Sequence, residues 1–195
     1  MSLQEELGKQ KREIGFVPVA ALDTLVTLDS VQQLVSDRLP QWSAHHGFER
    51  SLARALPRAR KLIAVLVLSG LEEHIPYFVS QGISDDVFRI QDMRMFAHLD
   101  VQARARIRKE QWTVPPILSA REHFYFQDGT ILPFSEMKVV NHGSYGIVHK
   151  IKVAEGHLDS DWPGYREVSA ESSTARNYPF LAYVFFTQFI KPWAD

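Results

Sequence analysis

Hydrophobic residues recur every three or four positions through the first part of the chain, up to Pro115-Pro116. This is the spacing that places apolar side chains on one face of a helix. The pattern therefore predicts a series of amphipathic helices, which we expect over residues 2–14, 19–26, 48–56, 72–81 and 101–112.

Capping residues mark where several of these helices begin and end. Ser2 and Glu5 have the spacing of a capping box, in which each side chain accepts a hydrogen bond from the other residue's backbone amide. A further helix is expected to begin at Asp29 or Ser30, either of which suits a helix cap, and to end at Pro40. Gly82 is a natural stop for the helix before it.

The most hydrophobic run of the first half covers residues 61–70. It is apolar almost all round, which favours a central buried helix, although a buried strand gives the same pattern. Ser84-Asp85-Asp86-Val87 resembles another helix start, and Asp85 and Asp86 are neighbours in sequence rather than a paired acid and base. The apolar residues that follow are expected to fill the core, namely Met93, Met95, Phe96 and Leu99.

The pattern changes after Pro116 to short runs of aromatic and β-branched residues. Residues 123–134 predict a hairpin around the turn dipeptide Asp128-Gly129, and two more strands are expected over 137–142 and 145–153. Residues 154–177 are polar and predict a loop. The aromatic stretch 178–190 favours a buried strand or helix over a membrane contact, because it is short for a membrane span.

Together these elements predict an α+β protein: a helical domain over residues 1–118, a small antiparallel β portion over 119–155, and a polar loop with an aromatic C-terminal segment over 156–195. Hydrophobic residues make up 45% of the sequence, which is typical of a folded globular protein.

Composition also excludes several classes of function. A formal net charge of −1 argues against a nucleic-acid binder, so the basic residues of 101–112 are interpreted as a solvated helix face, as are Arg50, Arg54 and Arg58. The absence of cysteine excludes disulfides, thiol catalysis and thiolate metal sites. With no signal peptide and no apolar run of about 20 residues, we expect no membrane partner and an intracellular, cytoplasmic or nuclear location.

The segment with the most specific chemistry is the strand, turn and strand over residues 139–153. Gly143 and Gly146 flank Ser144 and Tyr145, and Val148 follows. In the protein-kinase glycine-rich loop such glycines let backbone amides approach the ATP phosphates, while a valine covers the adenine. Asn141 occupies the position of that motif's first glycine. A structural hairpin that needs glycine at its turn would have the same residues.

Residues 1–155 resemble a group of fungal kinase-like proteins that carry a helical region ahead of a protein-kinase domain. The resemblance rests on five phrases in their order along the chain: residues 63–68, 74–78, 82–85, 111–114 and 131–134. It implies the first strands of a kinase amino-terminal lobe, and a nucleotide site formed by Asn141, Gly143, Ser144, Tyr145, Gly146 and Val148.

The resemblance ends near residue 155. A kinase requires a lysine on its third strand, whereas this chain has no lysine between Lys152 and Lys191, no His-Arg-Asp and no Asp-Phe-Gly. We therefore expect a truncated, catalytically inactive pseudokinase that acts through an unidentified protein partner. The alternatives are a weak ATP-binding module without a metal, or a fragment or misannotated form of an active fungal Ser/Thr kinase. The sequence indicates no oligomeric state.

Other candidate sites have weaker patterns. The eight histidines, including the pair His45-His46 and the series His142, His149 and His157, lack the spacing of zinc ligands. Ser144 lies between glycines but not in the Gly-x-Ser-x-Gly setting of a hydrolase nucleophile. Lys150 and Lys152 alternate along one strand, where solvent exposure is favoured over contact with a phosphate.

Overall fold

The computed structural model describes residues 2–43, 47–89, 93–115, 117–118, 131–143, 146–154, 156–158 and 181–186. Within these ranges the side chains of residues 43, 89, 93, 140–143, 146–150 and 181–186 lie outside the description. The chain divides into two compact units, one of Met1–Pro115 with Gln127–Ile131 and one of Pro116–Phe126 with Leu132–Asp195. The first is helical and the second contains the sheet, so the protein is α+β.

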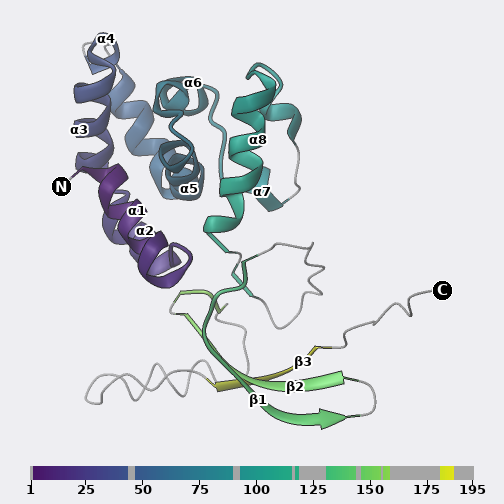
Figure 1. The fold of residues 1–195 in the computed structure, drawn as a ribbon. Coiled ribbons are helices and arrows are strands. Elements are labelled where there is room, and N and C mark those ends of the chain that lie inside the picture. The colour runs from purple at the N-terminus through teal and green to yellow at the C-terminus, as the bar shows by residue number, and fades with distance from the viewer. Residues whose placement is uncertain are drawn as a thin grey trace, which may run out of the picture. The chain divides into compact units, whose positions relative to one another are not determined.

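The described part of the first unit consists of short helices around one long one (Figure 1). The α-helices are α1 (Leu3–Ile14), α2 (Val19–Leu25), α3 (Leu28–Arg38), α4 (Pro40–Ser43), α5 (Phe48–Leu68), α6 (Ile75–Ser80), α7 (Asp86–Arg89) and α8 (Val101–Glu110). Three 3₁₀ turns connect them, η1 (Glu72–His74), η2 (Met93–Phe96) and η3 (Gln111–Thr113).

The predicted start of α1 is confirmed, and the predicted start of α3 is wrong. Ser2 Oγ accepts from the Glu5 amide at 3.3 Å, and the Glu5 carboxylate accepts from the Ser2 amide at 2.8 Å. In α3 the cap is Thr27, whose Oγ1 accepts from the Ser30 amide at 3.2 Å. Ser30 is three residues further along, where its hydroxyl reaches back to the Thr27 amide, and Asp29 lies in the first helical turn.

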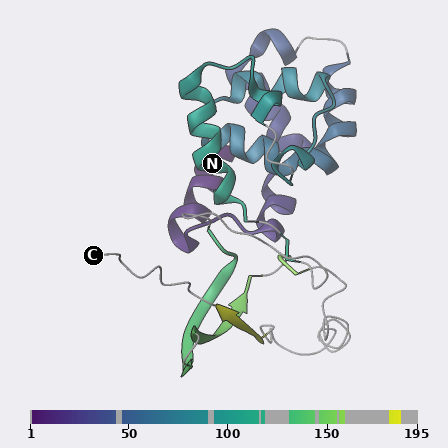
Figure 2. The ribbon, with the colours of Figure 1, turned by 90° about the vertical axis from the view of Figure 1, so that its right-hand side faces the viewer.

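Helix α5 is the centre of the helical core. It joins the two predicted helices over 48–56 and 61–70, so the strand alternative for the apolar run is excluded. Residues 62–67 are all buried, as expected of a helix that is apolar all round. The helix packs against α1, α2, α3, α4, α6 and α8. Figure 1 shows it between α3 and α8, and the stacking of these helices is seen from a second side in Figure 2.

A kink divides α5 into two halves. Ala59 has φ −133° and ψ 18°, which is not helical, and Pro57 lies two residues before it. Proline supplies no backbone N–H and its ring clashes with the carbonyl four residues earlier, so Pro57 weakens the turn before the kink. The backbone amides that begin the second half therefore need partners from elsewhere in the chain.

Glycines end α5 and α6 in the same way. Gly70 and Gly82 have φ of 62° and 64°, and each lies one residue past the helix cap. The Gly82 amide donates to the Val79 carbonyl, and the next amide, of Ile83, donates to the Phe78 carbonyl, both at 3.1 Å. This is the Schellman pattern, and it confirms Gly82 as the stop of the preceding helix.

The predicted core role of Met95 is wrong. Its side chain is 41% exposed, whereas Phe96 and Leu99 are buried as expected. Residues 93–96 form the 3₁₀ turn η2, in which adjacent side chains point in different directions, so Phe96 faces the core and Met95 does not. The side chain of Met93 lies outside the described residues.

The second unit contains an antiparallel sheet of β1 (Phe134–Gly143), β2 (Gly146–Val153) and β3 (Leu181–Phe186), in the order β1-β2-β3 (Figures 1 and 2). Of the buried strand or helix expected over 178–190, residues 181–186 form the strand β3, and its burial lies outside the description. Of the hairpin predicted over 123–134, residues 123–130 with the Asp128-Gly129 turn lie outside the description, as do residues 155 and 159–177 of the loop predicted over 154–177. Residues 131–133 are not in a strand, contrary to expectation, and the Pro133 carbonyl instead accepts from the Ala154 amide at 2.8 Å.

One end of the sheet has a small core of its own. Ile151 and Val153 of β2 are buried with Leu118, and Phe134 and Leu158 pack against them. The backbone of His157, a fully buried residue, accepts a hydrogen bond from the Leu118 amide at 2.8 Å. The face of β2 that carries Ile151 and Val153 is therefore the inner face of the sheet at this end.

Candidate functional site

The glycine hairpin joins β1 to β2. Gly143 is paired with Gly146 at the end of the ladder, and Asn141 is paired with Val148. The predicted strand, turn and strand order is therefore present. β1 ends one residue after the expected 142, at Gly143, and β2 begins one residue after the expected 145, at Gly146. Ser144 and Tyr145, the two residues between the glycines, lie outside the described residues.

The pairing of β1 with β2 is irregular next to Asn141, the residue at the position of the first glycine of the kinase motif. Val139 pairs with His149 and Asn141 with Val148, so Val140 is an extra residue in β1. A second irregularity falls at Ser135, between Phe134 and Glu136. Such bulges twist a strand and shift its register, so the pairing of Asn141 with Val148 is displaced by one residue from that of Val139 with His149.

Lys152 lies on the face of β2 opposite the small core, since side chains alternate along a strand and Ile151 and Val153 face the core. Lys152 Nζ lies 3.3 Å from the Glu136 carboxylate, with the glutamate half-exposed. Lys152 therefore has an acidic partner on β1. A contact of this kind at the surface is compatible with the solvent exposure predicted for Lys152. Lys150 is paired through its backbone with Lys138, and its own side chain is outside the description.

The third strand also bears on the kinase resemblance. β3 pairs antiparallel with β2, with Lys150 opposite Tyr183 and Val148 opposite Phe185. Its six residues are Leu-Ala-Tyr-Val-Phe-Phe, and none is a lysine. The cation that a kinase carries on its third strand is thus missing from the strand that lies next to the hairpin.

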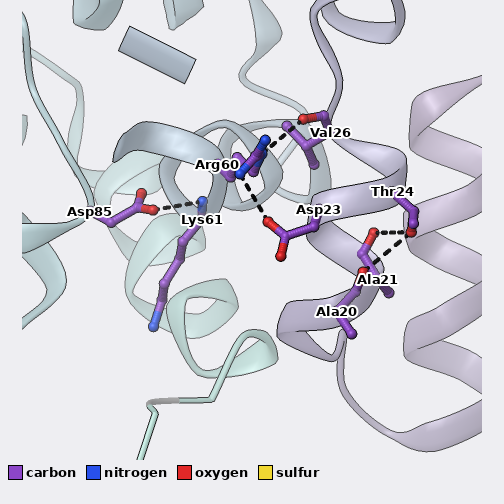
Figure 3. A network of polar contacts seen from close by, with 8 residues as sticks. All are labelled: Ala20, Ala21, Asp23, Thr24, Val26, Arg60, Lys61 and Asp85. Atoms are coloured by element: carbon purple, nitrogen blue, oxygen red, sulfur yellow. Dashed lines mark hydrogen bonds and ion pairs between the residues drawn. The ribbon is translucent and has the colours of Figure 1, made fainter. Parts of the chain in front are cut away.

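A second polar site, which the sequence did not indicate, lies at the kink of α5 (Figure 3). The Asp85 carboxylate accepts from the backbone amides of Leu62 at 2.8 Å and Lys61 at 3.1 Å. The Asp85 amide in turn donates to the Arg58 carbonyl at 2.7 Å. Asp85 thus satisfies backbone groups on both sides of the kink, as a cap supplied from a distant loop.

Burial changes the acidity of two groups at this site. Desolvation lowers the pKa of Lys61 to about 8, and the nearby Asp85 charge opposes this shift. Desolvation raises the pKa of Asp85, against the two backbone hydrogen bonds that favour its ionised form. The Lys61 side chain extends away from the carboxylate in Figure 3, and its ammonium lies 5.3 Å from the centre of the Phe88 ring. The arrangement is that of a structural cap with a desolvated lysine beside it.

Two further ion pairs join the helices. Arg60 Nη1 lies 2.9 Å from Asp23, and Arg60 Nε donates to the Val26 carbonyl at the end of α2 (Figure 3). Lys11 Nζ lies 2.6 Å from Glu110, whose carboxylate also accepts from Thr113 Oγ1 at 2.8 Å. These contacts link α1 and α2 to later helices, and this structural role is sufficient to explain them.

The basic residues of α8 agree with the interpretation of a solvated face. Arg106, Arg108 and Lys109 are exposed, and Arg106 Nη1 donates to the Ser69 carbonyl at the end of α5, at 3.0 Å. The arginines Arg50, Arg54 and Arg58 are exposed as well.

His74 and His98 form a small ring cluster at the surface with Tyr77. The ring centres of Tyr77 and His98 are 4.2 Å apart, and those of His74 and His98 are 6.0 Å apart. Burial and the neighbouring His74 lower the pKa of His98. Within the described ranges no three histidine or acidic residues are grouped as a metal site would require.

Among the described residues, none of the helices has both the length and the apolar character that a membrane span needs. Comparison of the chain with models of protein families, with curated proteins and with solved structures found no significant match.

Proposed function

We propose that this protein is a non-catalytic, kinase-like protein whose sheet serves protein binding. The observation that supports the absence of catalysis is the composition of β3. This strand pairs with β2 of the glycine hairpin and contains no lysine.

The lysine matters because phosphoryl transfer depends on positioning and charge neutralisation rather than on covalent chemistry. In kinases that lysine holds the α- and β-phosphates and pairs with a helix glutamate. Lys152 on β2 is no substitute, since its ammonium is already paired with Glu136 at 3.3 Å. A hairpin without the cation would cover a nucleotide but not align its phosphates.

The test is a phosphoryl-transfer assay on the purified 195-residue chain with γ-labelled ATP, Mg²⁺ and a generic protein substrate. We expect incorporation no greater than that of the Gly143→Val variant, which blocks the approach of a phosphate to the loop. Label transfer by the parent chain that disappears in Gly143→Val would overturn the proposal.

A second candidate is weak ATP binding without turnover, with Asn141, Gly143, Ser144, Tyr145, Gly146 and Val148 as the site. It is favoured by the pairing of Gly143 with Gly146, which places a glycine on each side of a two-residue connection. Thermal unfolding with millimolar Mg-ATP tests it, because a ligand that binds only the folded state raises the melting temperature. A shift that is lost in Gly143→Val and kept in Gly8→Ala would support binding, and no shift would exclude it.

The protein-binding part of the proposal is supported by β1. Among the described strands β1 is at an edge of the sheet, and Met137 and Val139 on it are 57% and 50% exposed. Exposed apolar residues on a strand edge are typical of a surface that pairs with another chain.

A further inference from the structure

We propose that β1 pairs antiparallel with β1 of a second copy of this chain, with Met137 facing Met137 of that copy across the twofold axis. This inference rests on the part of the proposed function in which the sheet binds another protein. It identifies that protein as a second copy of the same chain.

The outer edge of β1 offers a short regular stretch for such pairing. The irregularities at Ser135 and Val140 bracket residues 136–139, whose side chains are all exposed. Met137 is paired with the buried Ile151 and so lies on the inner face of the sheet, yet it is 57% exposed. The apolar inner face therefore continues to the edge strand, where no described residue covers it.

The charges of β1 are complementary to themselves in this register. In an antiparallel pair centred on Met137, Glu136 of each copy lies opposite Lys138 of the other. Opposite charges in directly opposed positions stabilise a sheet, and like charges destabilise it. Within one chain Lys138 is opposed by Lys150, a like charge. A second copy would supply Lys138 with a carboxylate, which no described residue of its own chain does.

The same register places the apolar groups together. Met137 opposes Met137 of the second copy, with Val139 two positions away on the same face of each strand. The pairing removes these exposed side chains from water and satisfies backbone groups at the strand edge. A one-residue shift of register would oppose Glu136 to Val139 and lose both charge pairs, so the sequence specifies one alignment.

Charge variants test the pairing in the full-length chain, by sedimentation equilibrium over a range of concentrations without nucleotide. We expect the parent chain to approach twice its monomer mass. Lys138→Glu and Glu136→Lys should each weaken self-association by at least about tenfold, because both symmetric pairs become repulsive. A mixture of the two variants should regain it, since each then meets opposite charges. Lys109→Glu, on the exposed face of α8, is the matched control and should associate like the parent.

Regained association in the mixture also shows that both variants are folded. A chain that stays monomeric at every concentration overturns the inference, and so does a dimer that neither single variant weakens. Neither result affects the expected absence of phosphoryl transfer, so the failure of this inference is distinct from the failure of the proposed function.

Because the sequence contains no cysteine, disulfide cross-linking of a single introduced cysteine provides a second test. Directly opposed residues of antiparallel strands have Cα atoms about 4.5–5.5 Å apart, within the range of a disulfide. Met137→Cys should therefore form a disulfide-linked dimer under mild oxidation, much faster than Met95→Cys, which is 41% exposed on the helical unit. Equal rates for the two variants would overturn the pairing.

Discussion

The carboxylate of Asp85 accepts a hydrogen bond from the backbone amide of Leu62, 23 residues earlier, at 2.8 Å. It accepts another from Lys61 at 3.1 Å. The second half of α5 therefore begins with a cap that its own sequence does not contain, and the most buried helix of the protein depends on a loop residue.

Asp85→Ala should lower the free energy of unfolding by about 1–3 kcal/mol, because two partly buried amides lose their acceptor. Asp85→Asn keeps one oxygen as acceptor and should cost less. Denaturant unfolding followed by circular dichroism measures both. The control is Asp37→Ala, an exposed aspartate of α3, and a cost for Asp85→Ala no larger than the control's would contradict the role of the cap.

Lys61 should give the protein a stability that increases on the alkaline side. Burial lowers its folded-state pKa to about 8 from 10.5, so the folded protein holds this proton less tightly than the unfolded chain. The contribution is present above pH 10.5 and is lost as the pH falls through about 8. Lys61→Met should remove this dependence and stabilise the protein at pH 7 by up to about 3 kcal/mol, since each unit of pKa corresponds to about 1.4 kcal/mol.

Urea unfolding at a series of pH values from neutral to alkaline tests this, with Lys109→Met as the control because Lys109 is an exposed lysine of α8. If Lys61→Met retains the alkaline rise of the parent chain, Lys61 is not its source.

Alanine at the glycines should give opposite results at different positions. Gly82 has φ of 64° with no atom within 4 Å of an added Cβ, so Gly82→Ala should destabilise through backbone strain alone, by about 1 kcal/mol. Gly8 lies inside α1, where Gly8→Ala should stabilise by up to about 1 kcal/mol. Thermal melts of the two variants should shift in opposite directions, and a stabilising Gly82→Ala would exclude the strained cap.

The ion pair of Lys11 with Glu110 should contribute more than a surface pair. The Glu110 side chain is 11% exposed and holds both Lys11 and Thr113. Glu110→Ala should cost about 1–3 kcal/mol, since a partly buried ammonium and hydroxyl lose their acceptor. A double-mutant cycle with Lys11→Met isolates the pair. The exposed pair of Lys152 with Glu136 should show a coupling below about 1 kcal/mol, and equal couplings for the two pairs would contradict the argument.

Local signals predicted most of the helices correctly. The capping box of Ser2 and Glu5, the apolar run of residues 62–67 and the stop at Gly82 each depend on residues within one or two turns of one another. Spacing alone reveals such features. The predicted cap of α3 was wrong by only a few residues. Thr27 and Ser30 both have side chains that can cap a helix, and the backbone conformation makes Thr27 the cap.

Long-range relationships could not be predicted in the same way. Nothing near Asp85 indicates that it caps a helix 23 residues away. At the glycine hairpin the two strands and their turn were predictable from alternation and glycine. The extra residue at Val140, which shifts the register of Asn141, was not, because a bulge is fixed by the pairing of two strands.

The cap at the α5 kink also has a consequence for the order of events during synthesis. Translation delivers residues 48–68 well before Asp85, so the emerging helix lacks the group that satisfies its interrupted backbone. We therefore expect the angle between the two halves of α5 to be fixed only once Asp85 is in contact with Lys61 and Leu62.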